Sequence, residues 1–142
     1  MLKRIDHIYL SVSNFSQSET FYDLIMRELG QYKGDKAIAG EPHAHYFGPQ
    51  FQLTIRPAKS AQKHDSYAPG LHHLCFQVET SPEVDLCYEK LRSVGIEVSS
   101  PQLYPEYHPE YYAIFFQDPD GIRLEIVTQT FTRQALESDG TN

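Results

Sequence analysis

Two segments of the chain, 66 residues apart, carry nearly the same strand pattern. The first is His7-Ile-Tyr-Leu-Ser-Val and the second is His73-Leu-Cys-Phe-Gln-Val. Because side chains alternate across a strand, the aliphatic residues of each segment share one face. Each histidine then lies on the opposite, more polar face. This repetition indicates a duplicated module, and it constrains the fold more than any other feature of the chain.

The same spacing recurs in the two predicted helices. Ser16 and Ser81 stand at the start of a helical pattern, and Gly30 and Gly95 end it, each pair 65 residues apart. The segment Ser16-Gln-Ser-Glu19 predicts a capping box, and the segment after Ser81 places proline at the first helical position. The apolar stripes that we expect to face the core are Phe21, Leu24, Ile25 and Leu29 in the first helix, and Val84, Cys87, Leu91 and Val94 in the second.

Three predicted strands follow each helix, at about 31–39, 43–48 and 50–56 and again at about 96–103, 111–117 and 121–128. The order βαβββ, repeated twice, predicts an α+β fold in which helices cover one face of mixed sheets and the other face encloses a cavity. We expect one domain over residues 1–142. Its parts are module one at about 4–57, a linker at about 58–69, module two at about 70–128, and a polar tail at 129–142 that frays.

Charge and composition narrow the classes of partner. The net charge is −7 and the basic residues form no cluster, which argues against a nucleic-acid partner. No apolar run approaches the roughly 18 residues of a membrane span. The first residues lead directly into a strand pattern without the apolar stretch of a signal peptide, so we expect a cytoplasmic protein.

A divalent-metal site is the main functional expectation from the residues. Glu125 lies in the last strand of module two, between Leu124 and Ile126, where a carboxylate is costly unless it is paired or binds metal. His7, His73 and Glu125 together are the ligand set of an open metal site. The alternative is a salt bridge from Glu125 to Arg123 or Arg56. Alternation places His72 on the face of Leu74, which excludes it as a ligand.

Two segments carry a resemblance to a known family. With the paired modules, Gly70-Leu-His-His-Leu-Cys-Phe-Gln-Val78 and Asp118-Pro-Asp-Gly-Ile-Arg-Leu-Glu125 resemble the vicinal oxygen chelate superfamily, over roughly residues 4 to 128. The resemblance implies a cup-shaped, incomplete barrel that holds one divalent metal ion (Zn, Ni, Mn, Co or Fe(II)). It also implies a small substrate that chelates the metal through vicinal oxygens. The superfamily pairs modules within or between chains, and the short linker with exposed sheet edges favours a homodimer.

The implied activity is that of a metal-dependent lyase or isomerase, with Glu125 as the catalytic base. The alternatives are an extradiol-type dioxygenase and a non-catalytic resistance protein that binds a small ligand. Two departures bear on this choice. Thr54 stands where glyoxalase I and methylmalonyl-CoA epimerase place a Glu or Gln ligand, and Phe115 stands where fosfomycin-resistance enzymes place a tyrosine.

The substrate-binding residues that we predict are Tyr9, Thr54, Arg56, Cys75, Gln77, Arg123 and His108. Arg56 or Arg123 would bind an anionic group, and a surface ion pair is the alternative for each. His108 belongs to the tyrosine-rich segment 104–112, interpreted as a loop at the cavity mouth or as tyrosines packed over strand ends. His43 and His45 are interpreted as surface or rim residues.

Overall fold

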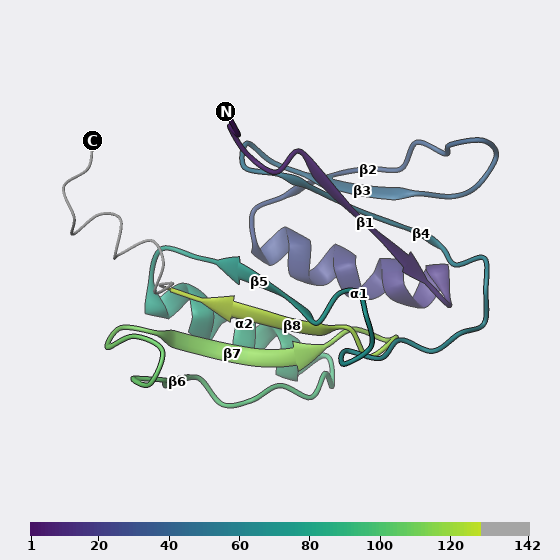
Figure 1. Ribbon diagram of the computed structural model, residues 1–142. Helices are drawn as coiled ribbons and strands as arrows, with labels where there is room; N and C mark the ends of the chain where they lie inside the picture. The colour runs from purple at the N-terminus through teal and green to yellow at the C-terminus, as the bar shows by residue number, and fades with distance from the viewer. Residues whose placement is uncertain (129–142) are drawn as a thin grey trace. The chain divides into compact units, whose positions relative to one another are not determined.

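The computed structural model describes residues 1–128, so the expected fraying of the tail at 129–142 lies outside the described residues (Figure 1). The chain divides into two compact units, residues 1–64 and 65–142. Each unit follows the order strand, helix, three strands, and each forms a four-stranded mixed sheet. The prediction of an α+β fold built from two βαβββ modules is therefore confirmed.

Unit 1 contains β1 (His7–Val12), α1 (Phe15–Glu28), β2 (Tyr32–Gly34), β3 (Ala44–Phe47) and β4 (Gln52–Pro57). Its strands are ordered β1-β4-β3-β2. β1 runs parallel to β4, and the other neighbours are antiparallel. A parallel pair needs a long crossover connection, which here includes α1.

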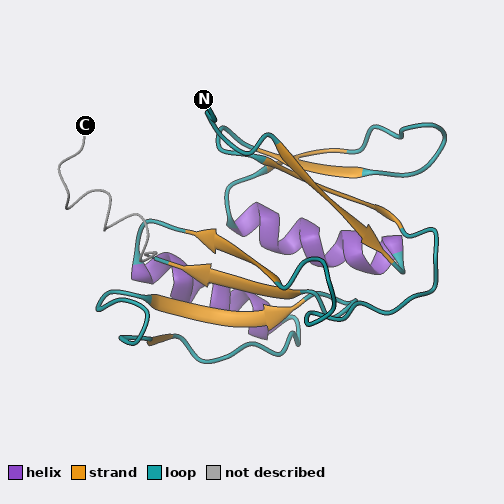
Figure 2. Cartoon of the chain, viewed as in Figure 1, coloured by secondary structure: helices purple, strands orange, loops and turns teal. Residues whose placement is uncertain are grey.

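Unit 2 repeats this arrangement with β5 (His73–Gln77), α2 (Ser81–Ser93), β6 (Gln102–Leu103), β7 (Tyr112–Gln117) and β8 (Arg123–Val127). The strands are ordered β5-β8-β7-β6, and β5 runs parallel to β8 (Figure 2). The register repeats as well, because Tyr9 lies opposite Thr54 in unit 1 and Cys75 lies opposite Glu125 in unit 2. Glu125 and Thr54 are thus equivalent positions of the two modules.

Each sheet packs its apolar face against its own helix. The cores comprise Val12, Ile25, Leu53 and Ile55 in unit 1, and Val84, Leu91, Ile114, Leu124 and Ile126 in unit 2, all of them fully or almost fully buried. His7 and His73 are exposed on the opposite face, as the alternation predicts. The helical stripes differ in detail from the expectation. Tyr22 and Met26 are buried in α1 while Leu24 and Leu29 are half-buried, and Val94 follows α2 as an exposed residue.

The start of each helix corrects the predicted caps. α1 begins after Asn14, whose side chain accepts a hydrogen bond from the backbone of Gln17, so the predicted capping box at Ser16 is wrong. Glu19, its expected partner, forms an ion pair with Lys33 instead. α2 has the capping box one residue before the expected start, between Thr80 and Glu83. Asparagine and threonine both suit this position because their side-chain oxygens reach the first free backbone donors.

Neither helix within residues 1–128 has the length and apolar character needed to cross a membrane.

Candidate metal and substrate site

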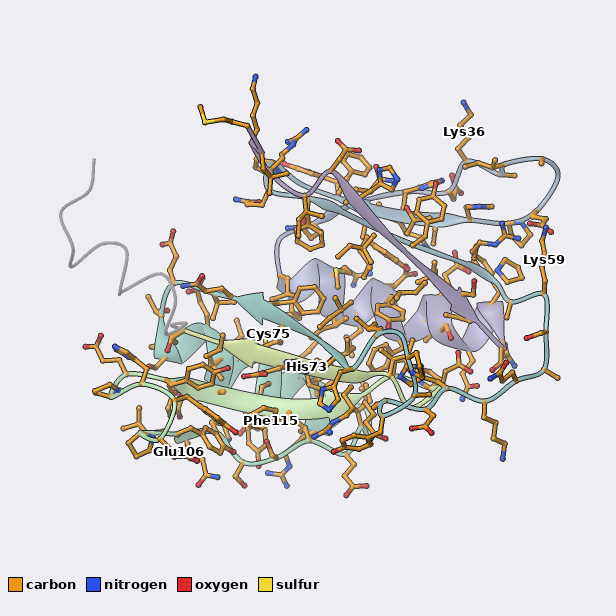
Figure 3. All side chains as sticks on the ribbon, in the orientation of Figure 1. Lys36, Lys59, His73, Cys75, Glu106 and Phe115 are labelled. Carbon is orange, nitrogen blue, oxygen red and sulfur yellow. The ribbon has the colours of Figure 1, made fainter. Side chains whose placement is uncertain are left out.

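The polar face of the unit 2 sheet carries a hollow of about 250 Å³. Its walls combine aromatic and ionisable side chains. The aromatic part includes Tyr107, Tyr111 and Phe115, and the ionisable part consists of His72, His73, Arg123 and Glu125. Figure 3 shows two of the elements that contribute, with His73 and Cys75 on β5 and Phe115 on β7. An aromatic hollow with a few convergent polar groups is the usual form of a small-molecule site.

The turn between β7 and β8 determines where Glu125 points. The Oδ1 atom of Asp118 accepts hydrogen bonds from the backbone nitrogens of Asp120 and Ile122, both at 2.9 Å. Gly121 has a φ of 81°, which glycine adopts without the steric cost that a side chain would bring. β8 then begins at Arg123, and its register sets Glu125 beside Cys75 on β5 and Phe115 on β7.

Glu125 is a buried carboxylate with polar partners on each oxygen. Its side chain is 6% exposed. The hydroxyl of Tyr111 donates a hydrogen bond to Oε1, and Oε2 lies 3.9 Å from Nε2 of His73. Burial, and then the hydrogen bond to Glu125, raise the pKa of Tyr111 above its ordinary value, so the phenol stays a donor at neutral pH. Within the described part of unit 2, the alternative salt bridge from Glu125 to Arg123 is not formed, because the partners of the carboxylate are Tyr111, His73 and Cys75.

Cys75 lies next to this carboxylate. The residue as a whole is exposed to solvent, whereas its thiol group interacts with Tyr111 and Glu125. Desolvation of the sulfur, followed by the negative charge of Glu125, raises the pKa of Cys75 to about 12. The thiol is therefore protonated at neutral pH, and Cys75 lies beside the carboxylate as a neutral group.

His73 carries one occupied nitrogen and one available nitrogen. Its Nδ1 lies 2.7 Å from Nδ1 of His72. In the tautomer in which Nδ1 of His73 donates, the lone pair of Nε2 faces Glu125. His72 lines the same hollow, which differs from the prediction that it would follow Leu74 to the other face. It precedes the first residue of β5, so strand alternation does not govern it.

The donor set of unit 2 fits part of a divalent-metal site. Metal bonds of about 2.0–2.2 Å to nitrogen and oxygen separate two ligands of one ion by about 3 to 4 Å, and the gap between Nε2 of His73 and Oε2 of Glu125 is 3.9 Å. Within the described residues of each unit, no group of three His, Cys, Asp or Glu side chains gathers around one point. Unit 2 therefore supplies two candidate ligands.

His7 belongs to unit 1, and one of its ring nitrogens is paired with a neighbouring carboxylate. Its Nδ1 donates a hydrogen bond of 2.7 Å to Oδ2 of Asp6. This hydrogen bond lowers the pKa of Asp6 below its ordinary value. A carboxylate bound to Nδ1 fixes the tautomer and leaves the lone pair on Nε2, which is the arrangement around many metal-ligating histidines.

The other predicted residues of unit 1 have partners within that unit. Thr54 is fully buried, and its hydroxyl lies 2.9 Å from Nδ1 of His45 and 2.9 Å from Nε2 of Gln52. Arg56 forms an ion pair with Glu41, which is the alternative expected for it. The ring of Tyr9 contacts the ring of His7 edge to face, with centroids 5.4 Å apart.

His43 does not lie at the surface. It is 3% exposed, its Nδ1 lies 3.0 Å from the carbonyl oxygen of Glu41, and its ring stacks on that of His45 at 5.7 Å. The interpretation as a surface residue is wrong for His43. The ring lies between those of Tyr9 and His45, and it belongs to a loop residue just before β3, for which strand periodicity carries no information.

Three predicted residues of unit 2 differ in their relation to the hollow. Arg123 lines it and donates a hydrogen bond of 3.1 Å to the hydroxyl of Tyr67. Gln77 bonds to the carbonyl oxygen of Thr128 at 3.1 Å, at the far end of β5. His108 accepts a hydrogen bond from the backbone nitrogen of Glu110 inside its own loop. Of these three, Arg123 is the one that lines the hollow.

Tyr111 is the site residue that sequence reasoning missed. It lies one residue before β7 and an even number of positions before Phe115 and Gln117. These two residues pair with Glu125 and Arg123 on the face of the sheet that carries the hollow. Extending the alternation of β7 backwards by one position would have placed Tyr111 on the same face of the sheet as Glu125.

The chain belongs to the Glyoxalase/Bleomycin resistance protein/Dioxygenase superfamily, whose model matches residues 4–126. This confirms the resemblance inferred from the histidine strands and the Asp-Pro-Asp-Gly turn. The family includes proteins that catalyse different reactions, so membership establishes the superfamily but not the reaction of this chain.

Individual relatives agree with this class. The chain is 34% identical to YqjT of Bacillus subtilis over 85% of this chain and 95% of that protein. It is 28% identical to the metallothiol transferase FosB of Shouchella clausii over 99% and 90% of the respective chains. A structure of a variant of the fosfomycin resistance protein FosX of Listeria monocytogenes, complexed with Mn(II) and 1S,2S-dihydroxypropylphosphonic acid, has a TM-score of 0.69. It is 21% identical over 94% of this chain and 98% of that one, a likeness that shows the common fold.

Proposed function

We propose that the protein is a divalent-metal-dependent enzyme that acts on a small substrate with vicinal oxygens, as a lyase or isomerase. One observation carries the proposal. Nε2 of His73 and Oε2 of Glu125 face each other across 3.9 Å at the wall of a hollow of about 250 Å³. A buried carboxylate in this position is readily accounted for if it binds a cation.

His7 is the proposed third ligand. The support is its equivalence to His73 in the repeated module and the hydrogen bond from its Nδ1 to Asp6, which leaves Nε2 available. The ligand would come from the same chain or from a second copy in a homodimer. Two histidines and one carboxylate suit Zn, Ni, Mn, Co or Fe(II) and leave positions open for substrate oxygens.

Two relatives support a metal-dependent function. FosB is named a metallothiol transferase, and the FosX structure contains Mn(II) with a phosphonic acid that carries two adjacent hydroxyl groups. Both are similar to this chain over nearly its whole length. The association with a metal ion is the property that we carry over to this chain, and their substrates are not carried over.

The ion, when bound, supplies a Lewis acid that polarises two neighbouring substrate oxygens. Residues of the hollow provide the remaining functions. Glu125 would leave the ion during turnover and accept a proton from the substrate carbon next to the carbonyl, as general base. Tyr111 donates a hydrogen bond through a hydroxyl that remains protonated at neutral pH. Arg123 offers a cation for an anionic group of the substrate.

An extradiol-type dioxygenase is the second candidate. The aromatic wall formed by Tyr107, Tyr111 and Phe115 favours a flat ligand such as a catechol, which also has vicinal oxygens. Oxygen consumption with catechols after anaerobic loading with iron(II) would support this candidate. A protein that binds a small ligand without turnover is the remaining class.

Elemental analysis of protein purified without a metal-affinity tag tests the proposal first. We expect close to one divalent ion per chain. We also expect His7→Ala, His73→Ala and Glu125→Ala to lose most of the bound metal, while His108→Ala retains it, because His108 bonds to the backbone of its own loop. His72→Ala should keep the ion with weaker affinity, since it removes only the partner of Nδ1. A wild-type protein that binds no divalent ion at neutral pH would contradict the enzyme proposal and favour a metal-free binding protein.

A further inference from the structure

The loop before β7 is a closed, hydrogen-bonded turn. The backbone nitrogen of Tyr104 bonds to the carbonyl oxygen of Tyr111 at 2.8 Å and closes its base. Inside it, Tyr107 bonds back to Tyr104 at 3.0 Å, and Tyr111 bonds back to His108 at 3.0 Å. The backbone of Tyr111 is therefore held at both its nitrogen and its carbonyl oxygen.

Aromatic packing also holds the side-chain ring of Tyr111 in place. Its centroid lies 5.2 Å from that of Tyr107, which lies 6.2 Å from that of Tyr104. Tyr104 in turn packs edge to face on Phe115 of β7, at 5.2 Å. Distances of this size are those of favourable aromatic pairs. The cluster anchors the loop to the sheet that carries Glu125.

The hydroxyl of Tyr111 contacts one oxygen of the carboxylate only. It donates to Oε1 of Glu125, while Oε2 is the oxygen nearest to Nε2 of His73. A phenol has a single proton to donate, so it selects one of the two oxygens. We propose that Tyr111 is a positioning residue that occupies Oε1 and presents Oε2 of Glu125 to the metal ion.

This inference rests on the proposed function and adds to it a residue outside the three-ligand set. A carboxylate that binds metal through one oxygen takes one coordination position, whereas two-oxygen binding takes two. With Oε1 held by Tyr111, the ion keeps an additional position for a substrate that binds through two oxygens. The tyrosine-rich loop thus serves the metal site through Glu125.

Titration of metal-free protein with Co(II), followed by calorimetry and by the visible absorption of the bound ion, tests the proposal. Tyr111→Phe should weaken Co(II) binding about 10- to 100-fold and change the visible spectrum, as expected when a group that holds a metal ligand is removed. Tyr112→Phe is the matched control. Its hydroxyl also donates to a carboxylate, Asp85 at 2.7 Å, which lies on α2. We expect the control to bind Co(II) within about twofold of wild type.

A second measurement follows Tyr111 directly by its absorption, beginning with the wild type. The chain has 10 tyrosines and no tryptophan, so tyrosine dominates its near-ultraviolet absorption. Binding of Co(II) to Glu125 should perturb Tyr111 and give a tyrosine difference spectrum in the wild type and in Tyr112→Phe, but not in Tyr111→Phe.

The outcomes separate the two proposals. If the wild type binds no Co(II), the proposed function fails, and the role of Tyr111 fails with it. If the wild type binds Co(II) without a tyrosine difference spectrum, or Tyr111→Phe binds it as tightly and with the same visible spectrum, only the role of Tyr111 is overturned.

Discussion

Replacement of Glu125 by glutamine tests the metal site with little change in shape. Glutamine has the size of glutamate, and its amide oxygen can still accept the hydrogen bond from Tyr111. What it lacks is the negative charge that faces Nε2 of His73. We therefore expect Glu125→Gln to fold normally and to bind divalent metal at least 100-fold more weakly, a loss of at least about 2.7 kcal/mol.

The same numbers give the expected change in melting temperature. A metal concentration of 100 times Kd stabilises the folded wild type by about 2.7 kcal/mol. A chain of this size shifts its Tm by about 4 °C per kcal/mol, so the wild type should gain about 10 °C. At the same concentration, a variant with 100-fold weaker binding gains at most about 0.4 kcal/mol, or about 2 °C.

Differential scanning calorimetry with and without Co(II) measures both quantities. Without metal, the free energy of unfolding of the variant should stay within about 1 kcal/mol of the wild type, because the removed charge was buried and the hydrogen bond can persist. Glu106→Gln, an exposed change in the neighbouring loop (Figure 3), is the control and should gain the full 10 °C. A Glu125→Gln protein that gains as much as the wild type would refute the assignment of Glu125 as a ligand.

Further outcomes follow from the same site. Thr54 is buried and bonded to His45 where glyoxalase I would place a ligand, so we expect weak or absent turnover of the glutathione–methylglyoxal adduct in a standard absorbance assay; robust turnover would contradict this. Metal affinity measured by calorimetry should fall below about pH 6, because histidine binds metal only when deprotonated; constant affinity down to pH 5 would count against histidine ligands. Cys75, with its pKa raised to about 12, should react slowly with iodoacetamide at pH 7 and faster as the pH rises, as measured by peptide mass spectrometry; rapid alkylation at pH 7 would show that the thiolate is accessible there. Light scattering over a dilution series should give the mass of a dimer, and a monomer that keeps its metal at every concentration would exclude a site shared between two chains.

The sequence by itself determined the elements and the faces of the strands. Alternation placed His73 and Glu125 on the polar face of the second sheet and Leu124 and Ile126 in its core, as the structure has them. These features follow from the local geometry of a strand, whose side chains alternate whatever the rest of the chain does. The duplicated pattern extended the same reasoning to the order of elements in both modules.

The tertiary structure alone decided which partners the functional side chains take. Tyr111 reaches Glu125 from 14 residues away, and Arg56 reaches Glu41 from 15 residues away. The burial of His43 likewise comes from contacts with the rings of Tyr9 and His45. Each of these contacts involves a loop residue (Tyr111, Glu41 or His43), and a loop has no period from which its path can be predicted. Its course is set by hydrogen bonds and packing that form only when the module is assembled.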